Sequence, residues 1–145
     1  SRGLGDVYKR QPGRTARRAG LPDGRPLIGL PGYPVAAYVD YLEFVRPLID
    51  RMLGLAFERA PPRVRARLVR RVPSRPGVRH FVRVRLRRAG GGLEAEPLAY
   101  SGSGILSSLT EADALLVIPE EVEGLPEGAE VEVVLLRPFL RGVVE

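Results

Sequence analysis

The stretch from Gly29 to Gly54, GLPGYPVAAYVDYLEFVRPLIDRMLG, decides the fold expected for the N-terminal part of the chain. A short apolar strand, Pro26 to Leu30, passes through a proline-glycine turn into a long amphipathic helix. Pro34 suits the first helical position, because its missing N–H would have no partner there. Backbone N–H groups are exposed at a helix N-terminus, where an anion can be held. The turn is therefore a candidate binding site.

The helix carries one wide apolar stripe and ends at Gly54 as its C-terminal cap. Pro47 interrupts its interior, so we expect a kink there rather than an end. Only one short strand precedes the stripe and can pack on it. This implies that the stripe is covered by a part that is missing from this chain or by a partner. Its members are Val35, Tyr38, Val39, Leu42, Val45, Leu48, Ile49, Met52 and Leu53.

Composition excludes several classes of protein. The 145 residues are 44% hydrophobic and 28% charged, as in a globular protein, and no apolar run is long enough to span a bilayer or act as a secretory signal. We therefore expect a cytoplasmic protein. The chain has no cysteine, so disulfides and thiolate metal sites are excluded. Its one histidine is His80, so a serine-histidine-acid triad is not expected.

The net charge of +6 would suit a nucleic-acid partner, but the charges are segregated along the chain. From Arg59 to Arg88 every charged residue is arginine, and from Ala89 to Leu136 every one is acidic. In a compact fold two such blocks can face each other, and solvated strand faces with ion pairs then explain most of the arginines.

From Arg63 onward the apolar period becomes alternating, which is typical of strands with one buried face. The glycines after Ala89 form a hairpin turn, so Glu94 and Glu96 should lie opposite the arginines of the preceding strand as cross-strand ion pairs. Further on we expect a short helix over roughly residues 105–112, a strand over 114–119, a turn over 124–128 and a last strand over 130–136. This predicts a small, mostly antiparallel β-barrel or sandwich carrying one short helix.

Three ordered blocks carry a family resemblance: GLPGYPVAAYVDYLEFVRPLIDRMLG, PSRPGVRHFVRV and SGSGILSSLTEADALLVIPE. They resemble the C-terminal part of the molybdopterin molybdenumtransferases, the MoeA family, which includes the E domain of gephyrin. The resemblance implies insertion of molybdate into adenylylated molybdopterin with release of AMP, with magnesium as cofactor. It also implies a homodimer whose cleft lies between the α/β domain of one subunit and the barrel of the other. We expect no nucleic acid and no membrane as partner.

The resemblance also organises the chain into segments. The fold class is α+β: residues 12–58 are expected to be the C-terminal remnant of an α/β molybdopterin-binding domain, of which we expect residues 12–25 to be loop. Residues 59–140 are expected to form the C-terminal β-barrel domain, and 141–145 a truncated tail. Residues 1–11, SRGLGDVYKRQ, resemble a non-native adapter-like tail and are left out of the fold prediction.

Site residues are carried over by position. Pro31, Gly32 and Pro34 match the family's LPGNP turn, with Tyr33 in place of its asparagine and Ala36 in place of a serine that helps to bind the oxyanion. In the barrel, Arg79 and Ser103 match residues that face the molybdate pocket, with Arg75 and Ser101 as the nearest substitutes. A guanidinium and a hydroxyl can hold a dianion by charge-assisted hydrogen bonds.

Other interpretations remain open. The turn could only position the helix, and residues 101–104 could only cap the next one. No catalytic or metal-binding residue is expected in this chain, so alone it should be inactive. Alternative functions are a nucleic-acid-binding barrel, for which a steep fall of affinity with salt would be diagnostic, and a protein-interaction module.

Overall fold

The computed structural model describes residues 7–8, 17–20, 26–55, 61–98 and 104–137. These residues fall into two compact units, 10–60 and 1–9 together with 61–145. The units are described separately. Among the described residues, none of the helices has the length and apolar character needed to cross a membrane.

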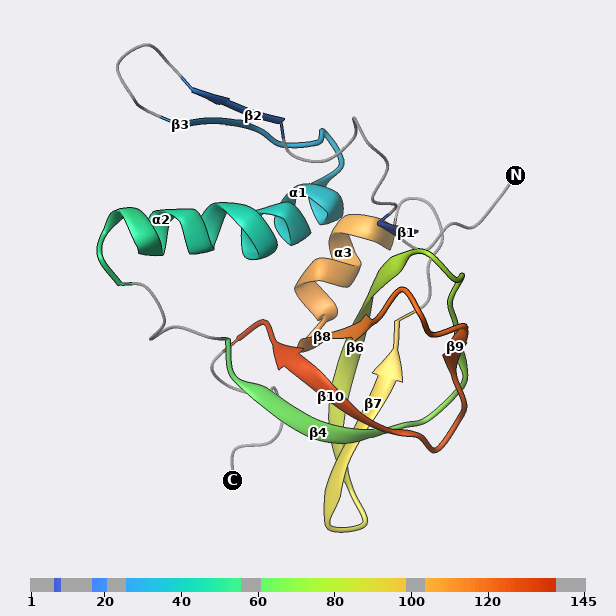
Figure 1. The fold of residues 1–145 in the computed structure, drawn as a ribbon. Helices are drawn as coiled ribbons and strands as arrows, with labels where there is room; N and C mark the ends of the chain where they lie inside the picture. Colours follow the sequence, from blue (N-terminus) through green and yellow to red (C-terminus); the bar gives the residue numbers. More distant parts are fainter. Residues whose placement is uncertain (1–6, 9–16, 21–25, 56–60, 99–103, 138–145) are drawn as a thin grey trace. The chain divides into compact units, whose positions relative to one another are not determined.

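The first unit holds a β-hairpin and a helical stretch (Figure 1). Strand β3 (Pro26–Gly29) pairs antiparallel with β2 (Arg17–Gly20), so the prediction of a loop throughout residues 12–25 is wrong at β2. The pairing partner lies in an arginine- and glycine-containing segment without alternating apolar residues, and local pattern could not reveal it.

The predicted long helix runs over residues 34–52, but it is not α-helical throughout. It consists of α1 (Pro34–Asp40), a π-helical turn η1 (Tyr41–Val45) and α2 (Arg46–Met52). The expected irregularity thus falls just before Pro47, the second residue of α2. Proline cannot donate a hydrogen bond to the preceding turn, and the wider π turn, in which Arg46 N–H bonds to the Tyr41 carbonyl, accommodates this.

The second unit is a closed five-stranded barrel with one helix, which confirms the predicted small, mostly antiparallel barrel (Figure 1). Around the barrel, β6 pairs with β7, β7 with β4, β4 with β10, β10 with β8, and β8 again with β6. All pairings are antiparallel except that of β7 with β4, which closes the barrel and which the sequence did not predict. The strands are β4 (Arg63–Leu68), β6 (Arg79–Ala89), β7 (Gly92–Pro97), β8 (Ala114–Ile118) and β10 (Glu130–Leu135).

Three minor strands complete the sheets. β5 (Val72–Pro73) pairs with β9 (Gly124–Leu125), at a place where a simple turn was expected. Gly124 is required there, because its φ is +124° and an added Cβ would lie 2.6 Å from the Val72 carbonyl oxygen. β1 (Val7–Tyr8) pairs with the start of β6, within the segment left out of the fold prediction.

The barrel core is apolar and comes from alternate residues of each strand. On β6 these are Val82, Val84 and Leu86, so the residues between them face outward. Helix α3 (Gly104–Glu111) packs against β6 on the outside. The buried core residues are Ala66, Leu68, Val72, Val82, Val84, Leu86, Ala95, Ala114, Leu116, Ile118, Val131 and Val133.

Asp113 joins α3 to the barrel. Its carboxylate Oδ2 accepts a hydrogen bond from Leu86 N–H at 2.9 Å, its N–H donates to the Val84 carbonyl at 3.0 Å, and its carbonyl accepts from Leu136 N–H at 2.9 Å. Only 2% of the residue is exposed. The chain therefore leaves α3 and enters β8 through a residue bonded to two other segments.

We expect Asp113→Ala to destabilise the barrel by about 1–3 kcal/mol, because the buried Leu86 N–H loses its acceptor. Urea unfolding followed by circular dichroism measures the loss. Glu121→Ala, on an exposed loop, is the matched control and should change stability little. Equal unfolding free energies for Asp113→Ala and the parent chain would contradict the role given to this carboxylate.

Candidate functional site: two arginines on the outer face of β6

The turn before α1 has the geometry that the sequence predicted. Pro34 is the first helical residue, and Tyr33 caps the helix in an extended conformation (φ −85°, ψ 122°) without a side-chain hydrogen bond. The Tyr33 carbonyl accepts the first helical hydrogen bond, from Ala37 N–H at 2.9 Å. Gly32 and Pro34 are exposed and Pro31 is half-buried, while 74% of Tyr33 is exposed. The Tyr33 side chain therefore makes no capping hydrogen bond.

In the barrel, three outward-facing residues of β6 follow one another: Arg79, Phe81 and Arg83. They alternate with residues that face the core, as the strand period requires. Arg79 is exposed, and its guanidinium carbon lies 5.7 Å from the centre of the Phe81 ring. Phe81 itself is only 6% exposed. The arginine predicted to contact substrate is therefore stacked on a buried ring.

Arg83 is the residue that the sequence analysis missed. It is only 2% exposed, although it faces outward and was counted among the solvated or ion-paired arginines. Arg83 lies opposite Leu115 of β8, which is also buried. It belongs to β6, the strand against which α3 packs. Alternation revealed which way Arg83 points, but nothing local in the sequence revealed that this face would be covered.

The other predicted barrel residues are placed as follows. Ser103 and its substitute Ser101 lie outside the described residues. Arg75, the substitute for Arg79, is exposed in the segment after β5. His80 is 6% exposed and lies on the same side of β6 as the core valines, which favours the packing role considered for it.

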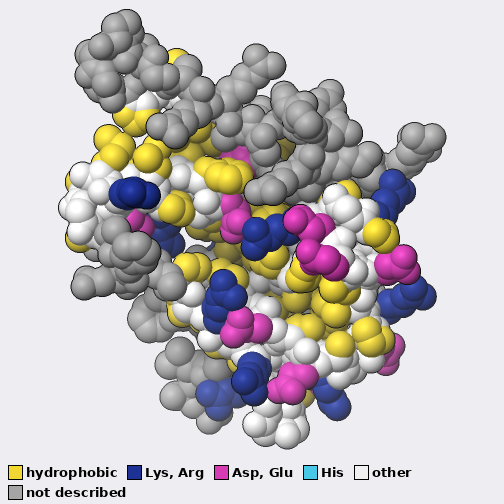
Figure 2. Space-filling view, viewed as in Figure 1, with side chains coloured by type: hydrophobic (Ala, Val, Ile, Leu, Met, Phe, Trp, Pro, Cys, Tyr) yellow, Lys and Arg dark blue, Asp and Glu magenta, His cyan; other side chains and the backbone are white. Residues whose placement is uncertain are grey.

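Most of the remaining strand arginines are ion-paired, as expected. Glu94 lies opposite Arg87 and Glu96 opposite Arg85 in the β6–β7 register. The contacts run partly along diagonals: Arg87 pairs with Glu96, whereas Arg85 reaches Glu111 of α3 at 2.8 Å. Two more pairs are Arg67–Glu94 at 3.4 Å and Arg63–Glu132 at 2.9 Å. Figure 2 shows the resulting mixture of basic and acidic side chains over the barrel.

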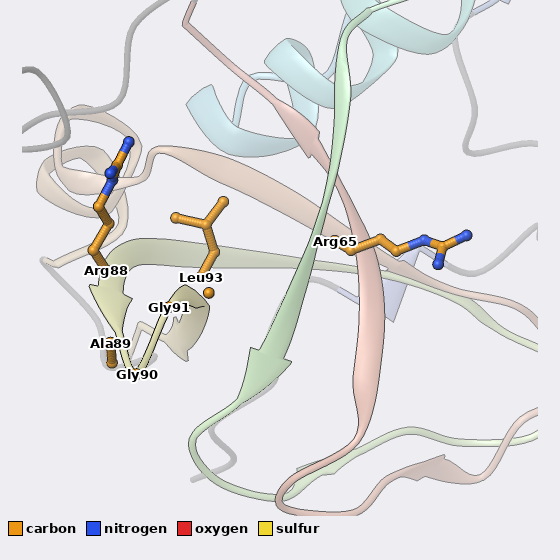
Figure 3. Close-up of a pocket in the computed structure, with 7 residues that line it drawn as sticks. Arg65, Arg88, Ala89, Gly90, Gly91 and Leu93 are labelled. Atoms are coloured by element: carbon orange, nitrogen blue, oxygen red, sulfur yellow. The ribbon is translucent and has the colours of Figure 1, made fainter.

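A surface hollow of about 710 Å³ lies beside the tip of the β6–β7 hairpin. Its lining includes Arg65 and Arg88, with Leu93 and the turn glycines. Figure 3 shows that the two guanidinium groups point in different directions and do not converge on the hollow. The hollow is therefore a poor anion site, and the β6 arginines are the better candidates.

Asp40 is a second residue whose environment differs from the prediction. It is not among the residues of the predicted apolar stripe, yet it is 0% exposed at the end of α1. Burial raises the pKa of this carboxyl above its ordinary value of 3.8. Perturbed carboxyl groups are often functional, but this one is equally a structural feature of the π turn that follows it.

The described residues do not offer a metal centre. Among them, no group of three or more histidine, aspartate or glutamate side chains is placed to hold an ion. A magnesium ion therefore does not fit this part of the chain, and no chemical step is assigned to one here.

The chain is similar to a set of known proteins. Residues 65–136 match the family described as MoeA C-terminal region (domain IV). A Methanocaldococcus jannaschii protein named for molybdopterin biosynthesis is 36% identical over 81% of this chain and 26% of its own length. The molybdopterin molybdenumtransferase of Bacillus subtilis is 32% identical over 77% of this chain and 26% of its own length.

Solved structures agree with these relatives. A molybdopterin biosynthesis MoeA protein from Pyrococcus horikoshii superimposes with a TM-score of 0.70 at 36% identity, over 94% of this chain and 33% of its own. A molybdenum cofactor biosynthesis protein from Pyrococcus furiosus gives 0.60 at 42% identity, over 72% of this chain and 36% of its own. The chain therefore belongs to the MoeA family, through the C-terminal region of its members. It spans about a quarter of the length of the curated relatives it matches.

The raised pKa of Asp40 predicts how its replacement acts with pH. Because the folded state disfavours the ionised carboxylate, Asp40 costs stability at neutral pH, and the cost disappears as pH falls through the folded pKa to below 3.8. Asp40→Asn should therefore stabilise the chain at pH 7 and lose this advantage in acid. Urea unfolding at pH 7 and pH 3.5 tests the sign, with Glu121→Gln at an exposed position as control. A gain that does not depend on pH would show that desolvation is not the cause.

Proposed function

We propose that this chain is part of a molybdopterin molybdenumtransferase, which acts in molybdenum cofactor biosynthesis in the cytoplasm. The reaction is insertion of molybdate into adenylylated molybdopterin with release of AMP. The observation that carries the proposal is the match of residues 65–136 to the MoeA C-terminal region, on a barrel that bears Arg79 and Arg83 on one face. Magnesium, which the family uses, would be held by residues other than those described.

We propose that two parts of the chain bind the oxyanion of the substrate. The turn Pro31, Gly32 and Pro34 offers exposed backbone ahead of a helix N-terminus. In the barrel we keep Arg79 and Ser103 and add Arg83. A buried guanidinium is weakly hydrated and keeps its charge, so it suits a dianion that has itself been partly desolvated. Tyr33 stands in place of the family's usual asparagine and Ala36 in place of a serine that helps to bind the oxyanion, so one side-chain contact is lost, and we expect weaker molybdate binding than in relatives with the usual turn.

We propose a homodimer, with the turn of one subunit and the barrel of the other forming one cleft. The helix of the first unit supports this, because several of its large apolar side chains are exposed. They include Tyr41 at 39%, Phe44 at 47%, Met52 at 62% and Leu53 at 66%. Exposed apolar side chains in this number mark surface that is covered in an assembly. We do not assign a nucleic-acid partner, since Arg63, Arg67, Arg85 and Arg87 are ion-paired.

A chimera tests the assigned reaction. This chain, replacing the matching C-terminal region of the Bacillus subtilis relative, should support molybdenum insertion, measured as molybdenum bound to molybdopterin. The chain alone should give no insertion, because it spans only about a quarter of the length of the curated relatives it matches. Insertion by the purified chain alone, or a folded chimera without activity, would contradict the proposal.

Two arginine variants of the chimera test the assigned residues. Arg79→Ala should raise the KM for molybdate about ten-fold or more, since a hydrogen bond to a charged group contributes about 1.5–3 kcal/mol. Arg83→Lys keeps a positive charge but loses the planar fork, and should raise the KM without unfolding the barrel. Arg65→Ala, on the exposed face of β4, is the matched control. An effect of Arg75→Ala in place of Arg79→Ala would move the assignment to that residue.

A further inference from the structure

Strand β6 is longer than the two strands that pair with it in the barrel on either side. It spans 11 residues, whereas β7 spans 6 and β8 spans 5. β8 pairs with the N-terminal half of β6, from His80 to Val84, and β7 pairs with the C-terminal half, from Val84 to Ala89. Each half of β6 therefore has one edge along which the neighbouring strand does not extend. Backbone groups on such an edge need other partners.

In the C-terminal half of β6, a side chain supplies such a partner. The pairing with β8 ends where Val84 lies opposite Ala114. Two residues further along β6, the Leu86 N–H donates to the Asp113 carboxylate at 2.9 Å. The carboxylate thus accepts the hydrogen bond that a longer β8 would have accepted.

In the N-terminal half of β6, a further strand supplies the partner (Figure 1). β1 pairs antiparallel with the start of β6, with Val7 opposite His80 and Tyr8 opposite Arg79. β8 already pairs with the other edge at His80, so β1 lies on the edge along which β7 pairs further on. β1 has only two residues, and so short a strand has little stability of its own. The β6 edge is therefore the template on which it forms.

We propose that the N-terminal half of β6 is a strand-addition site, where an extended segment of a protein partner binds antiparallel in the position that β1 occupies in this chain. At such a site main-chain hydrogen bonds provide affinity, and alternate side chains provide selectivity. β1 comes from a segment that resembles a non-native tail, which fits an edge that recognises backbone more than sequence. The partner segment is thus an extended peptide rather than a helix.

The register defines which side chains the partner segment can carry. A residue opposite His80 shares the core side of β6, and His80 is only 6% exposed, so an apolar side chain suits that position. The neighbouring residue lies opposite Arg79, which is exposed, and can be polar or aromatic. The Val-Tyr sequence of β1 meets both requirements.

The two positions of β1 differ in the direction of their backbone groups. Successive residues of a strand direct their N–H and C=O groups to opposite edges. The Arg83 carbonyl accepts a hydrogen bond at 3.0 Å from the residue that follows β7, so Arg79, four residues earlier, directs its groups to this same edge. Tyr8 opposite Arg79 should therefore form the hydrogen-bonded pair, whereas the N–H of Val7 is directed away from β6.

Hydrogen exchange in the 145-residue chain tests this arrangement. Tyr8→Pro removes the N–H that faces Arg79, and should speed exchange of the Arg79 amide about two- to ten-fold, as expected for the loss of one hydrogen bond. Val7→Pro is the matched control and should change this exchange little. The Val82 amide, opposite Leu116 of β8, should be unaffected in both variants and reports that the barrel is folded.

A peptide added in trans tests the site itself. The peptide GDVYKR, residues 5–10, added at about millimolar concentration to the Tyr8→Pro chain, should restore slow exchange of the Arg79 amide. The same peptide methylated on the tyrosine backbone nitrogen should not. Exchange at Arg79 that is unchanged by Tyr8→Pro, or that the unmodified peptide does not slow, would overturn the proposal. Equal restoration by the methylated peptide would also overturn it, because binding would not depend on the backbone ladder.

Discussion

The hydrogen bonds of Asp113 join helix α3, on the outer face of the barrel, to two of the barrel strands. A single residue connects the end of α3 to β6 through Leu86 and Val84, and to the end of β10 through Leu136. Because α3 lies directly before this junction in the chain and packs on β6, the junction restrains the C-terminal end of the helix. Arg83, on the outer face of the same strand, is only 2% exposed. The Asp113 carboxylate therefore anchors the strand that carries the proposed site, although it does not itself belong to the site.

Charge segregation in the sequence becomes charge neutralisation in the fold. The arginines of β4 and β6 lie beside strands and a helix that carry glutamates, and four ion pairs form across them. Exposed pairs of this kind contribute little stability each, but like charges placed opposite each other would be destabilising. The arrangement thus favours the observed strand order over alternatives. It also explains why a net charge of +6 does not by itself mark a nucleic-acid-binding surface.

Local pattern predicted the elements whose partners are near in sequence. The β6–β7 register followed from alternating residues on both sides of a glycine turn, and Pro34 marked the start of α1. The pairing of β4 with β7, which closes the barrel, joins strands with no turn between them, and no periodicity encodes it. The same limit applies to the site: the sequence and its resemblance supplied Arg79. The burial of Arg83 and of Asp40 depends on what covers them.

Arg79 and Arg83, the two arginines of the proposed site on β6, differ in their exposure to solvent. Burial fixes Arg83 and removes competing water, which strengthens any charge-assisted hydrogen bond it makes but raises the cost of leaving the charge uncompensated. Arg79 remains exposed, with its guanidinium carbon 5.7 Å from the centre of the Phe81 ring. In the proposed function, a dianion would be reached by Arg79 from solvent and would meet Arg83 in a desolvated environment. The pairing of one buried and one accessible guanidinium on a single strand is therefore better suited to a transient oxyanion than two equally exposed arginines would be.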